Sequence, residues 1–194
     1  MKKVFIVHGF VGIPNGGWIP WLMEELAKNK IFACALAMPN PKNPSVPEWI
    51  EEISHAVNNA PDDEIYLVGH SLGATAVMKY LESIPNEKKV SGVVLISGLI
   101  SPLDPENSKS NYRAIDSFVV PSIYFEKVKN KSDKFILLHS VDDPAVPFAH
   151  AEIISKELNC KLVKVDKYKH FFILAEPICY QIPELLKIID EILE

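Results

Sequence analysis

The stretch IYLVGHSLG at residues 65–73 decides the fold of this 194-residue chain. An apolar run enters it at Ile65, and an Ala-rich apolar segment follows it. Its second half has the pattern Gly-x-Ser-x-Gly, with Ser71 between Gly69 and Gly73. Glycines at these two positions allow a strand and a helix to approach closely around a tight turn. The sequence therefore predicts a strand, a sharp turn that carries Ser71, and a helix over residues 71–84.

Short apolar runs and longer amphipathic segments alternate on both sides of this stretch. The expected strands are Val4–Val7, Ile31–Leu36, Ile65–Val68, Val93–Ile96, Phe135–Leu138 and Leu162–Val165. The expected helices are Trp18–Asn29, Val46–Asn58, Ser71–Ile84, Pro147–Leu158 and Pro183–Leu193, with a further helix at Pro121–Lys129. Several strands are apolar without alternation, as in strands that are buried on both faces. The pattern predicts one α/β domain over residues 1–194, a three-layer αβα sandwich around a mostly parallel sheet of about six strands.

Three local features refine this expectation. Ser45 and Glu48 have the spacing of a capping box at the start of the second helix. Pro147 and Pro183 are each expected in the first turn of a helix. Residues 99–118 are polar and rich in Pro, Asn and Ser, which predicts a surface loop near the working edge of the sheet. Whether that loop is a solvated connection or shapes a pocket stays open.

Composition excludes several classes of function. The net charge is −5, and the 20 Lys and Arg residues form no basic stripe, so we expect no nucleic-acid partner. No apolar run approaches the roughly 18 residues that span a bilayer. The short apolar run after Met1 is interpreted as a strand and not as a signal peptide. The cysteines Cys34, Cys160 and Cys179 have no metal or redox spacing, so we expect buried thiols and a cytoplasmic protein.

Ser71 is the candidate nucleophile. A tight turn would lift its hydroxyl clear of the sheet and point the backbone N–H of Leu72 at the space beside it. The first turn of the following helix would add partial positive charge there. The alternative is a serine that only caps the helix.

With this motif the chain resembles the α/β-hydrolases. The resemblance extends from His8-Gly9-Phe10 through the Gly69–Gly73 turn to Asp142-Asp143-Pro144 and His170-Phe171. Chain length and the stretch GGWIPW at residues 16–21 resemble, more narrowly, the small lidless serine hydrolases that include retinoblastoma-binding protein 9. The resemblance implies a lidless fold and carboxylesterase-like activity.

A serine nucleophile needs a base and a group that orients the base. The order of these residues in this fold is Ser, then Asp or Glu, then His. His139 precedes the candidate acids, and His150 lies within a predicted helix, where a surface position is expected. His170 follows the last strand and is therefore the expected base. In the resembling family a small residue usually precedes this histidine, where this chain has Lys169.

The acid is expected directly after the fifth strand. Asp143 fits the Asp-x-x-Val-Pro pattern of many α/β-hydrolases, and Asp142 is then a supporting turn residue. The choice between the two stays open, and Asp143 is favoured. Asx-turn chemistry before Pro144 is the alternative for both. His70 is expected to be a packing residue.

The oxyanion hole is expected to consist of two backbone N–H groups. One belongs to Leu72, and by resemblance the other belongs to Phe10, with Gly9 allowing its loop to approach Ser71. The expected walls of the substrate pocket are Phe10, Trp18 and Phe171, with Trp21 and Phe148 as further candidates.

The expected reaction is hydrolysis of an ester, thioester or activated amide through an acyl-enzyme on Ser71, with a small acyl substrate and no metal or organic cofactor. A protein partner is implied by resemblance alone. One alternative is a catalytically weak hydrolase scaffold that serves as a protein-interaction module. Another is different α/β chemistry, which the serine at position 71 and the absence of a phosphate-binding glycine motif disfavour.

Overall fold

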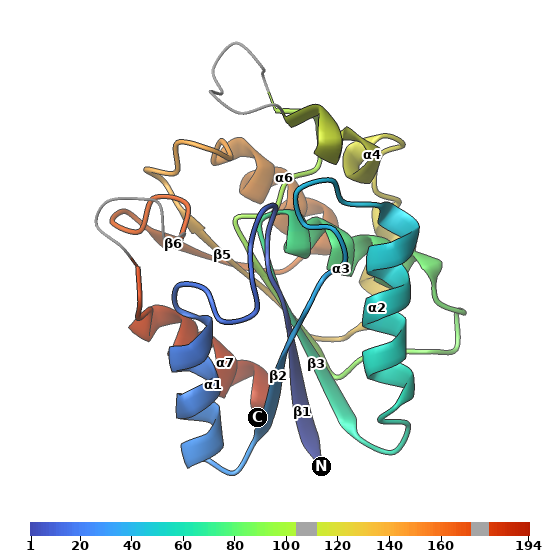
Figure 1. The fold of residues 1–194 in the computed structure, drawn as a ribbon, viewed down its shortest axis with the longest axis vertical. Helices are drawn as coiled ribbons and strands as arrows, with labels where there is room; N and C mark the ends of the chain where they lie inside the picture. The colour runs from blue at the N-terminus through green and yellow to red at the C-terminus, as the bar shows by residue number, and fades with distance from the viewer. Residues whose placement is uncertain (104–111, 172–178) are drawn as a thin grey trace.

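A six-stranded parallel sheet forms the middle layer of the protein in a computed structural model that describes residues 1–103, 112–171 and 179–194 (Figure 1). The strands are β1 (Lys2–Val7), β2 (Phe32–Leu36), β3 (Glu64–His70), β4 (Gly92–Ile96), β5 (Phe135–Ser140) and β6 (Lys161–Val165). Their order is β2-β1-β3-β4-β5-β6, and every neighbouring pair is parallel. All six predicted strands are confirmed. Several extend beyond their apolar core because polar end residues still pair with the neighbouring strand.

Helices cover both faces of this sheet. Helices α1 (Ile19–Lys28) and α7 (Pro183–Leu193) lie on one face, where Leu22 and Ile189 pack against the side chains of β1 and β3. Helices α2 (Val46–Asn58), α3 (Leu72–Ser83) and α6 (Ala149–Leu158) lie on the other, where Trp49 and Ile154 belong to the second apolar core. The predicted three-layer αβα sandwich is therefore confirmed.

The chain starts in the interior of the sheet and changes direction there. From β1 it runs outward to β2, then crosses back to β3 on the other side of β1. In open parallel sheets, such a switch point leaves a crevice at the carboxyl ends of the strands, where ligands bind. The carboxyl ends of β1 and β3 carry Gly9 and Ser71, so the sequence motif lies at this crevice.

The capping box at α2 is not formed. Ser45 is the residue before the helix and its carbonyl accepts the N–H of Trp49, but its side chain makes no capping hydrogen bond. The Glu48 carboxylate accepts a hydrogen bond from Asn40 Nδ2 at 3.3 Å instead. A tertiary partner has therefore replaced the local one.

Two predicted helix starts are wrong. Helix α6 begins at Ala149, so Pro147 precedes its first turn. The helix predicted at Pro121–Lys129 is reduced to α5 (Phe125–Val128), which the 3-10 turn η2 (Lys129–Lys131) follows. The carbonyl oxygens of Pro121 and Ser122 accept hydrogen bonds from the buried Lys79 Nζ, which diverts them from a helix.

The predicted surface loop at 99–118 is only partly right. Residues 104–111 lie outside the described residues. On either side of them Leu99, Leu103 and Phe118 are buried, and the chain forms η1 (Tyr112–Ile115) and α4 (Asp116–Val119). Apolar residues at its ends anchor this connection to the core.

Two findings bear on the composition. Among the helices of the described residues, none is long and apolar enough to cross a membrane. Cys179 is buried, whereas Cys34 and Cys160 are half-buried, and all three are free thiols.

Candidate active site

Ser71 sits on a strained turn between β3 and α3. Its backbone has φ 55° and ψ −123°, a region that residues other than glycine rarely adopt. A Cβ at Gly69 would lie 2.5 Å from the Ala74 Cα, and one at Gly73 would lie 2.2 Å from the Val7 carbonyl oxygen. Only glycine fits at these two positions, so the Gly-x-Ser-x-Gly pattern follows from the close approach of β1, β3 and α3.

The structure brings Ser71, His170 and Asp143 together. His170 Nε2 lies 2.8 Å from Ser71 Oγ, and His170 Nδ1 lies 2.8 Å from Asp143 Oδ2. In a neutral imidazole, Nδ1–H donates to the carboxylate and Nε2 accepts from the serine hydroxyl. The three residues come from the turn after β3, the turn after β5 and the segment after β6. They converge because parallel strands end at one edge of the sheet.

Asp143 is the aspartate that faces His170. Its side chain has 0% exposure, and Oδ1 accepts the backbone N–H groups of Ala145 and Val146 at 2.8 and 3.0 Å. Burial alone would raise the pKa of Asp143. The hydrogen bond from His170, the electrostatic attraction of the His170 ring and the two backbone N–H groups together lower the pKa of Asp143 below its ordinary value. Asp143 is therefore an ionised acceptor beside the imidazole.

Asp142 supports the segment that carries His170. Its Oδ1 accepts the Ser140 hydroxyl at 2.5 Å and the Lys169 backbone N–H at 3.0 Å. Its Oδ2 lies 3.1 Å from Lys169 Nζ. The two neighbouring aspartates thus have different contacts, and Asp142 touches the residue before His170.

Left-handed backbone flanks His170 on both sides. Lys169 has φ 50° and Phe171 has φ 54°. Glycine adopts this conformation without strain, so a lysine at position 169 carries a backbone strain that glycine would avoid. Two side-chain donors hold the segment: His70 Nε2–H donates to the His170 carbonyl at 2.8 Å, and Trp18 Nε1–H donates to the Phe171 carbonyl at 3.0 Å.

His70 therefore does more than pack. Its ring lies 5.1 Å from the His170 ring and 6.0 Å from the Trp18 ring, measured between centroids. Burial lowers the pKa of His70 to about 3, so its imidazole is neutral at physiological pH. A neutral ring next to Ser71 adds no positive charge that would compete with protonation of His170.

The other histidines that follow Ser71 are also buried. His139 Nε2 lies 3.6 Å from Asp143 Oδ2 and 3.0 Å from the Val146 carbonyl oxygen, a position the sequence did not reveal. The expected surface position of His150 is wrong, because His150 is only 8% exposed and its Nδ1 accepts the Ile100 N–H. The donor, the Ile100 N–H, comes from the connection after β4, and no local pattern could have identified it.

The loop after β1 lies against Ser71. A Cβ at Gly9 would lie 2.9 Å from the Ser71 Cβ and 3.4 Å from Oγ. Phe10 is the next residue and is half-buried. Leu72 is the first residue of α3, and the N–H groups of a helix's first turn have no acceptor within the helix. Both expected oxyanion donors therefore belong to segments that border Ser71.

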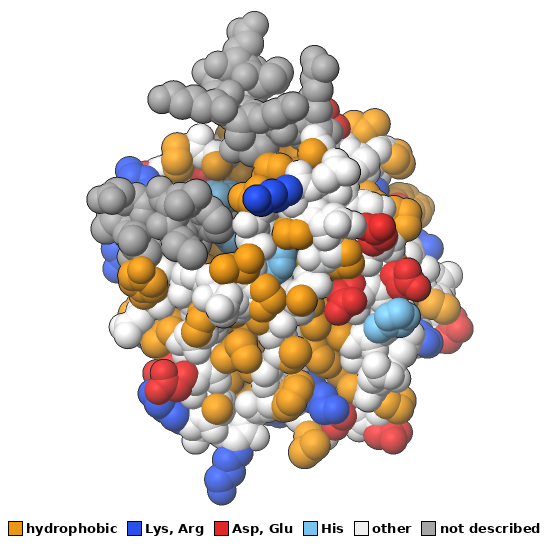
Figure 2. Space-filling view, viewed as in Figure 1, with side chains coloured by type: hydrophobic (Ala, Val, Ile, Leu, Met, Phe, Trp, Pro, Cys, Tyr) orange, Lys and Arg blue, Asp and Glu red, His pale blue; other side chains and the backbone are white. Residues whose placement is uncertain are grey.

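A cavity of about 220 Å³ adjoins this site. Trp18 and Phe171 line it, as expected, and both are 1% exposed. Phe10 is not among its lining residues, because its side chain packs toward the core on the other side of the sheet. Trp21 lines a separate hollow with Tyr180, and Phe148 packs edge-on against His139. In the space-filling view, hydrophobic side chains crowd the centre of the face, and histidine shows between them (Figure 2).

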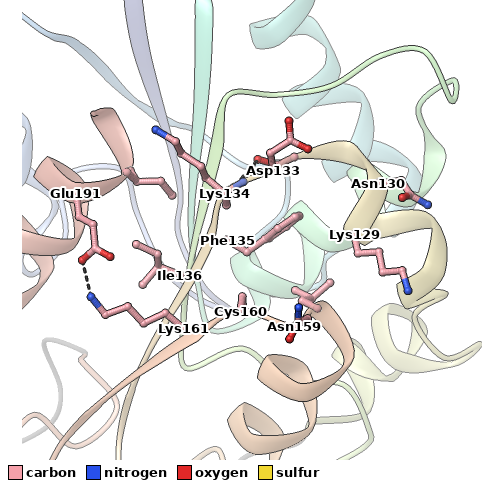
Figure 3. A pocket seen from close by; sticks show the side chains of 13 residues that line it. Lys129, Asn130, Asp133, Lys134, Phe135, Ile136, Asn159, Cys160, Lys161 and Glu191 are labelled. Atoms are coloured by element: carbon pink, nitrogen blue, oxygen red, sulfur yellow. Dashed lines mark hydrogen bonds and ion pairs between the residues drawn. The ribbon is translucent and has the colours of Figure 1, made fainter.

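A larger hollow of about 680 Å³ lies elsewhere, at the amino ends of β5 and β6. Figure 3 shows the charged side chains at its rim and the ion pair between Lys161 and Glu191, whose atoms are 2.5 Å apart. It is far from the convergence of Ser71, His170 and Asp143, because it opens at the opposite edge of the sheet.

The profile of the family described as serine hydrolase matches residues 4–179. This chain belongs to the serine hydrolase family. It is 30% identical to the serine hydrolase RBBP9 of Rattus norvegicus over 172 residues, which cover 87% of each chain. It is 29% identical to YdeN of Bacillus subtilis (strain 168) over 170 residues, 88% of this chain and 86% of the relative.

Solved structures agree with this assignment. The crystal structure of the B. subtilis ydeN gene product superposes with a TM-score of 0.89 at 27% identity, covering 100% of this chain and 99% of that one. Est1E from Butyrivibrio proteoclasticus superposes with a TM-score of 0.71 at 20% identity, covering 98% and 84%. The second likeness concerns the fold alone. The fold is that of the α/β-hydrolases, and family membership supports hydrolase activity.

Proposed function

We propose that this protein is a carboxylesterase-like serine hydrolase that cleaves an ester, thioester or activated amide through an acyl-enzyme on Ser71. The observation that carries the proposal is the hydrogen-bonded chain from Ser71 Oγ through His170 to Asp143, with 2.8 Å at each contact. The order of the three residues along the chain and the strained turn at Ser71 support it.

In the first half-reaction, Ser71 Oγ attacks the carbonyl carbon while its proton moves to His170 Nε2. Asp143 accepts the Nδ1–H of the resulting imidazolium, and its lowered pKa keeps it ionised for this purpose. The tetrahedral intermediate then collapses. The bond to the leaving group breaks, His170 returns the proton to that group, and the acyl group remains on Ser71.

In the second half-reaction, water attacks the acyl-enzyme. His170 takes one proton from the water as the new C–O bond forms, and it then protonates Ser71 Oγ as the acid leaves. Proton and electron pairs balance without a metal ion or organic cofactor in either half.

The backbone N–H groups of Leu72 and Phe10 would stabilise the oxyanion in both intermediates. Leu72 lies at the positive end of α3, and the close approach of Gly9 brings the Phe10 segment to Ser71. Loss of one such donor typically raises the barrier by about 2.7–4 kcal/mol. The substrate is therefore expected to be a small acyl compound whose carbonyl oxygen can reach both groups.

The test is labelling of the purified protein with a fluorophosphonate probe, read by intact mass, on wild type, Ser71→Ala and His170→Ala. We expect one adduct on wild type, none on Ser71→Ala and at least a hundredfold slower labelling of His170→Ala. Circular dichroism of each variant establishes that it is folded. No adduct on folded wild type would overturn the proposal and favour the interaction-scaffold alternative. An adduct on Ser71→Ala would assign the nucleophile elsewhere.

A further inference from the structure

The cavity of about 220 Å³ beside Ser71 is not needed for the acyl-enzyme chemistry itself. We propose that it binds one short apolar substituent of the substrate, an aliphatic chain of up to about eight carbons or a single aromatic ring, next to the scissile carbonyl. This inference rests on the proposed function and adds a substrate class to it.

The first argument for this proposal is the position of the cavity next to Ser71. Its wall includes Gly9, His70 and Phe171. Gly9 contacts Ser71 directly, His70 precedes Ser71, and Phe171 follows His170. The cavity therefore lies beside the position that the scissile carbonyl of a substrate would take at Ser71 Oγ.

The second argument is the apolar character of the residues that line the cavity. Among the described residues, no Lys, Arg, Asp or Glu lines the cavity. Its larger apolar side chains are those of Val11, Ile13, Trp18, Ile19 and Phe171, and its polar side chains include His8 and His70. The polar side chains of this wall are already engaged. His8 Nδ1–H donates to the Gly9 carbonyl at 2.9 Å, and His8 Nε2 accepts the Met38 N–H at 3.4 Å. Trp18 Nε1–H donates to the Phe171 carbonyl, and His70 Nε2–H donates to the His170 carbonyl. A charged substituent would lose its hydration there without a partner, whereas an apolar one gains from leaving water.

The third argument is the volume of the cavity, which limits the size of the substituent. An engineered protein cavity of about 150 Å³ holds one benzene ring. In proportion, about 220 Å³ accommodates roughly eight carbons. A long fatty acyl chain would have to leave the cavity through its mouth.

The mouth provides a way to test this size limit. Val11 and Ile13 are 39% and 49% exposed, so the apolar wall continues to the surface. Because Ile13 is half-exposed, its substitution changes the mouth without removing a core residue. Ile153 on α6 is 48% exposed and lines no part of this cavity, which makes it a matched control.

The experiment measures kcat/KM for two ester series, p-nitrophenyl esters with acyl chains of two to twelve carbons and acetate esters of alcohols of the same lengths. In at least one series we expect a rise of up to about fourfold per methylene, an optimum between four and eight carbons, and at least a tenfold fall by twelve. In that series, Ile13→Trp should lower the hexanoate-to-acetate ratio, or its alcohol equivalent, at least tenfold. Ile13→Ala should move the optimum to longer chains. Ile153→Trp and Ile153→Ala should keep the wild-type profile.

The series that responds tells which side of the ester enters the cavity, and either one supports the proposal. Equal rates at all lengths in both series, or the same shift in the Ile13 and Ile153 variants, would overturn it. Fluorophosphonate labelling of every variant separates the two proposals. A normal Ser71 adduct with no length dependence rejects the pocket alone, whereas no adduct on wild type rejects the acyl-enzyme as well.

Discussion

The turns at the two edges of the parallel sheet differ in where their residues with left-handed backbone lie. At the amino edge, the left-handed residues Lys30 and Asn159 follow α1 and α6, where such residues commonly end a helix. At the carboxyl edge, the left-handed residues follow strands instead: Val11, Asn40, Ser71, Ser97, Lys169 and Phe171. A strand can end without this conformation. The concentration of backbone strain at one edge therefore marks the working edge of the sheet.

The two edges also differ in the titratable side chains that they carry, with exposed ion pairs at the amino edge and buried histidines at the carboxyl edge. The amino edge carries exposed ion pairs such as Lys161–Glu191 and Lys89–Asp133, a kind that typically contributes under about 1 kcal/mol. The carboxyl edge buries His8, His70 and His139. The larger hollow lies at the amino edge and the smaller one at the carboxyl edge. Cavity size alone would therefore point to the amino edge, whereas backbone strain and buried titratable groups point to the carboxyl edge, where we propose the active site.

The largest expected effect separates the two aspartates after β5. Asp143→Asn should lower kcat about 10⁴-fold, because an amide no longer fixes the imidazole tautomer or stabilises the imidazolium. Asp142→Asn should lower it far less, since this carboxylate contacts Ser140 and the backbone of Lys169. Asp133→Asn at the amino edge is the control. Ester hydrolysis by the three variants decides the assignment, and an equal loss in Asp142→Asn and Asp143→Asn would contradict it.

The next effect compares two glycines at opposite edges. A Cβ at Gly9 would lie 2.9 Å from the Ser71 Cβ, so Gly9→Ala should push the Phe10 segment away and lower kcat about 10²- to 10³-fold. A Cβ at Gly92, where β4 begins, would lie 2.7 Å from Ile192 Cγ1. Gly92→Ala should therefore lower the free energy of unfolding by about 1–3 kcal/mol and spare the activity per folded molecule.

Urea unfolding and ester hydrolysis on both variants test this separation. If Gly92→Ala lost activity at constant stability, or Gly9→Ala lost only stability, the functional distinction between the edges would be wrong.

The sequence predicted the sheet and the convergence of Ser71, Asp143 and His170 because both depend on patterns along the chain. Buried parallel strands give continuous apolar runs, and residues that follow such strands share one edge. The sequence could not predict features that depend on distant partners. The burial of His150 depends on the Ile100 N–H, which donates to its ring. Glu48 accepts a hydrogen bond from Asn40 in place of a capping contact. The side-chain direction of Phe10 depends on its loop, where Val11 has φ 52°.

A pH effect on stability is expected from His70. Its pKa falls from 6.5 to about 3 in the folded protein, mainly because of burial. Between these two values the unfolded chain binds the proton and the folded chain does not, so stability decreases as the pH falls from about 6.5. One such group contributes a slope of up to about 1.4 kcal/mol per pH unit. His70→Gln should flatten the pH dependence by that amount between about pH 6 and pH 4.5.

Urea unfolding at several pH values measures this slope. His55→Gln, on a face of α2 where the side chain is 67% exposed, controls for the loss of a histidine. Equal slopes in wild type and His70→Gln would mean that His70 is not held neutral by burial.

The smallest effect concerns Lys30 and Lys169, two lysines with left-handed backbone conformation. Lys30→Gly, after α1, should raise the free energy of unfolding by about 0.5–1 kcal/mol, because glycine adopts this conformation without strain. Lys169→Gly relieves the same strain but loses the ion pair with Asp142, whose partners are 43% and 25% exposed. Such a pair contributes under about 1 kcal/mol, so the net change should stay within about 0.5 kcal/mol. Urea unfolding of both variants gives the difference directly. If Lys169→Gly were as stabilising as Lys30→Gly, the ion pair with Asp142 would contribute nothing, and Asp142 would support the segment that carries His170 only through the Lys169 backbone N–H.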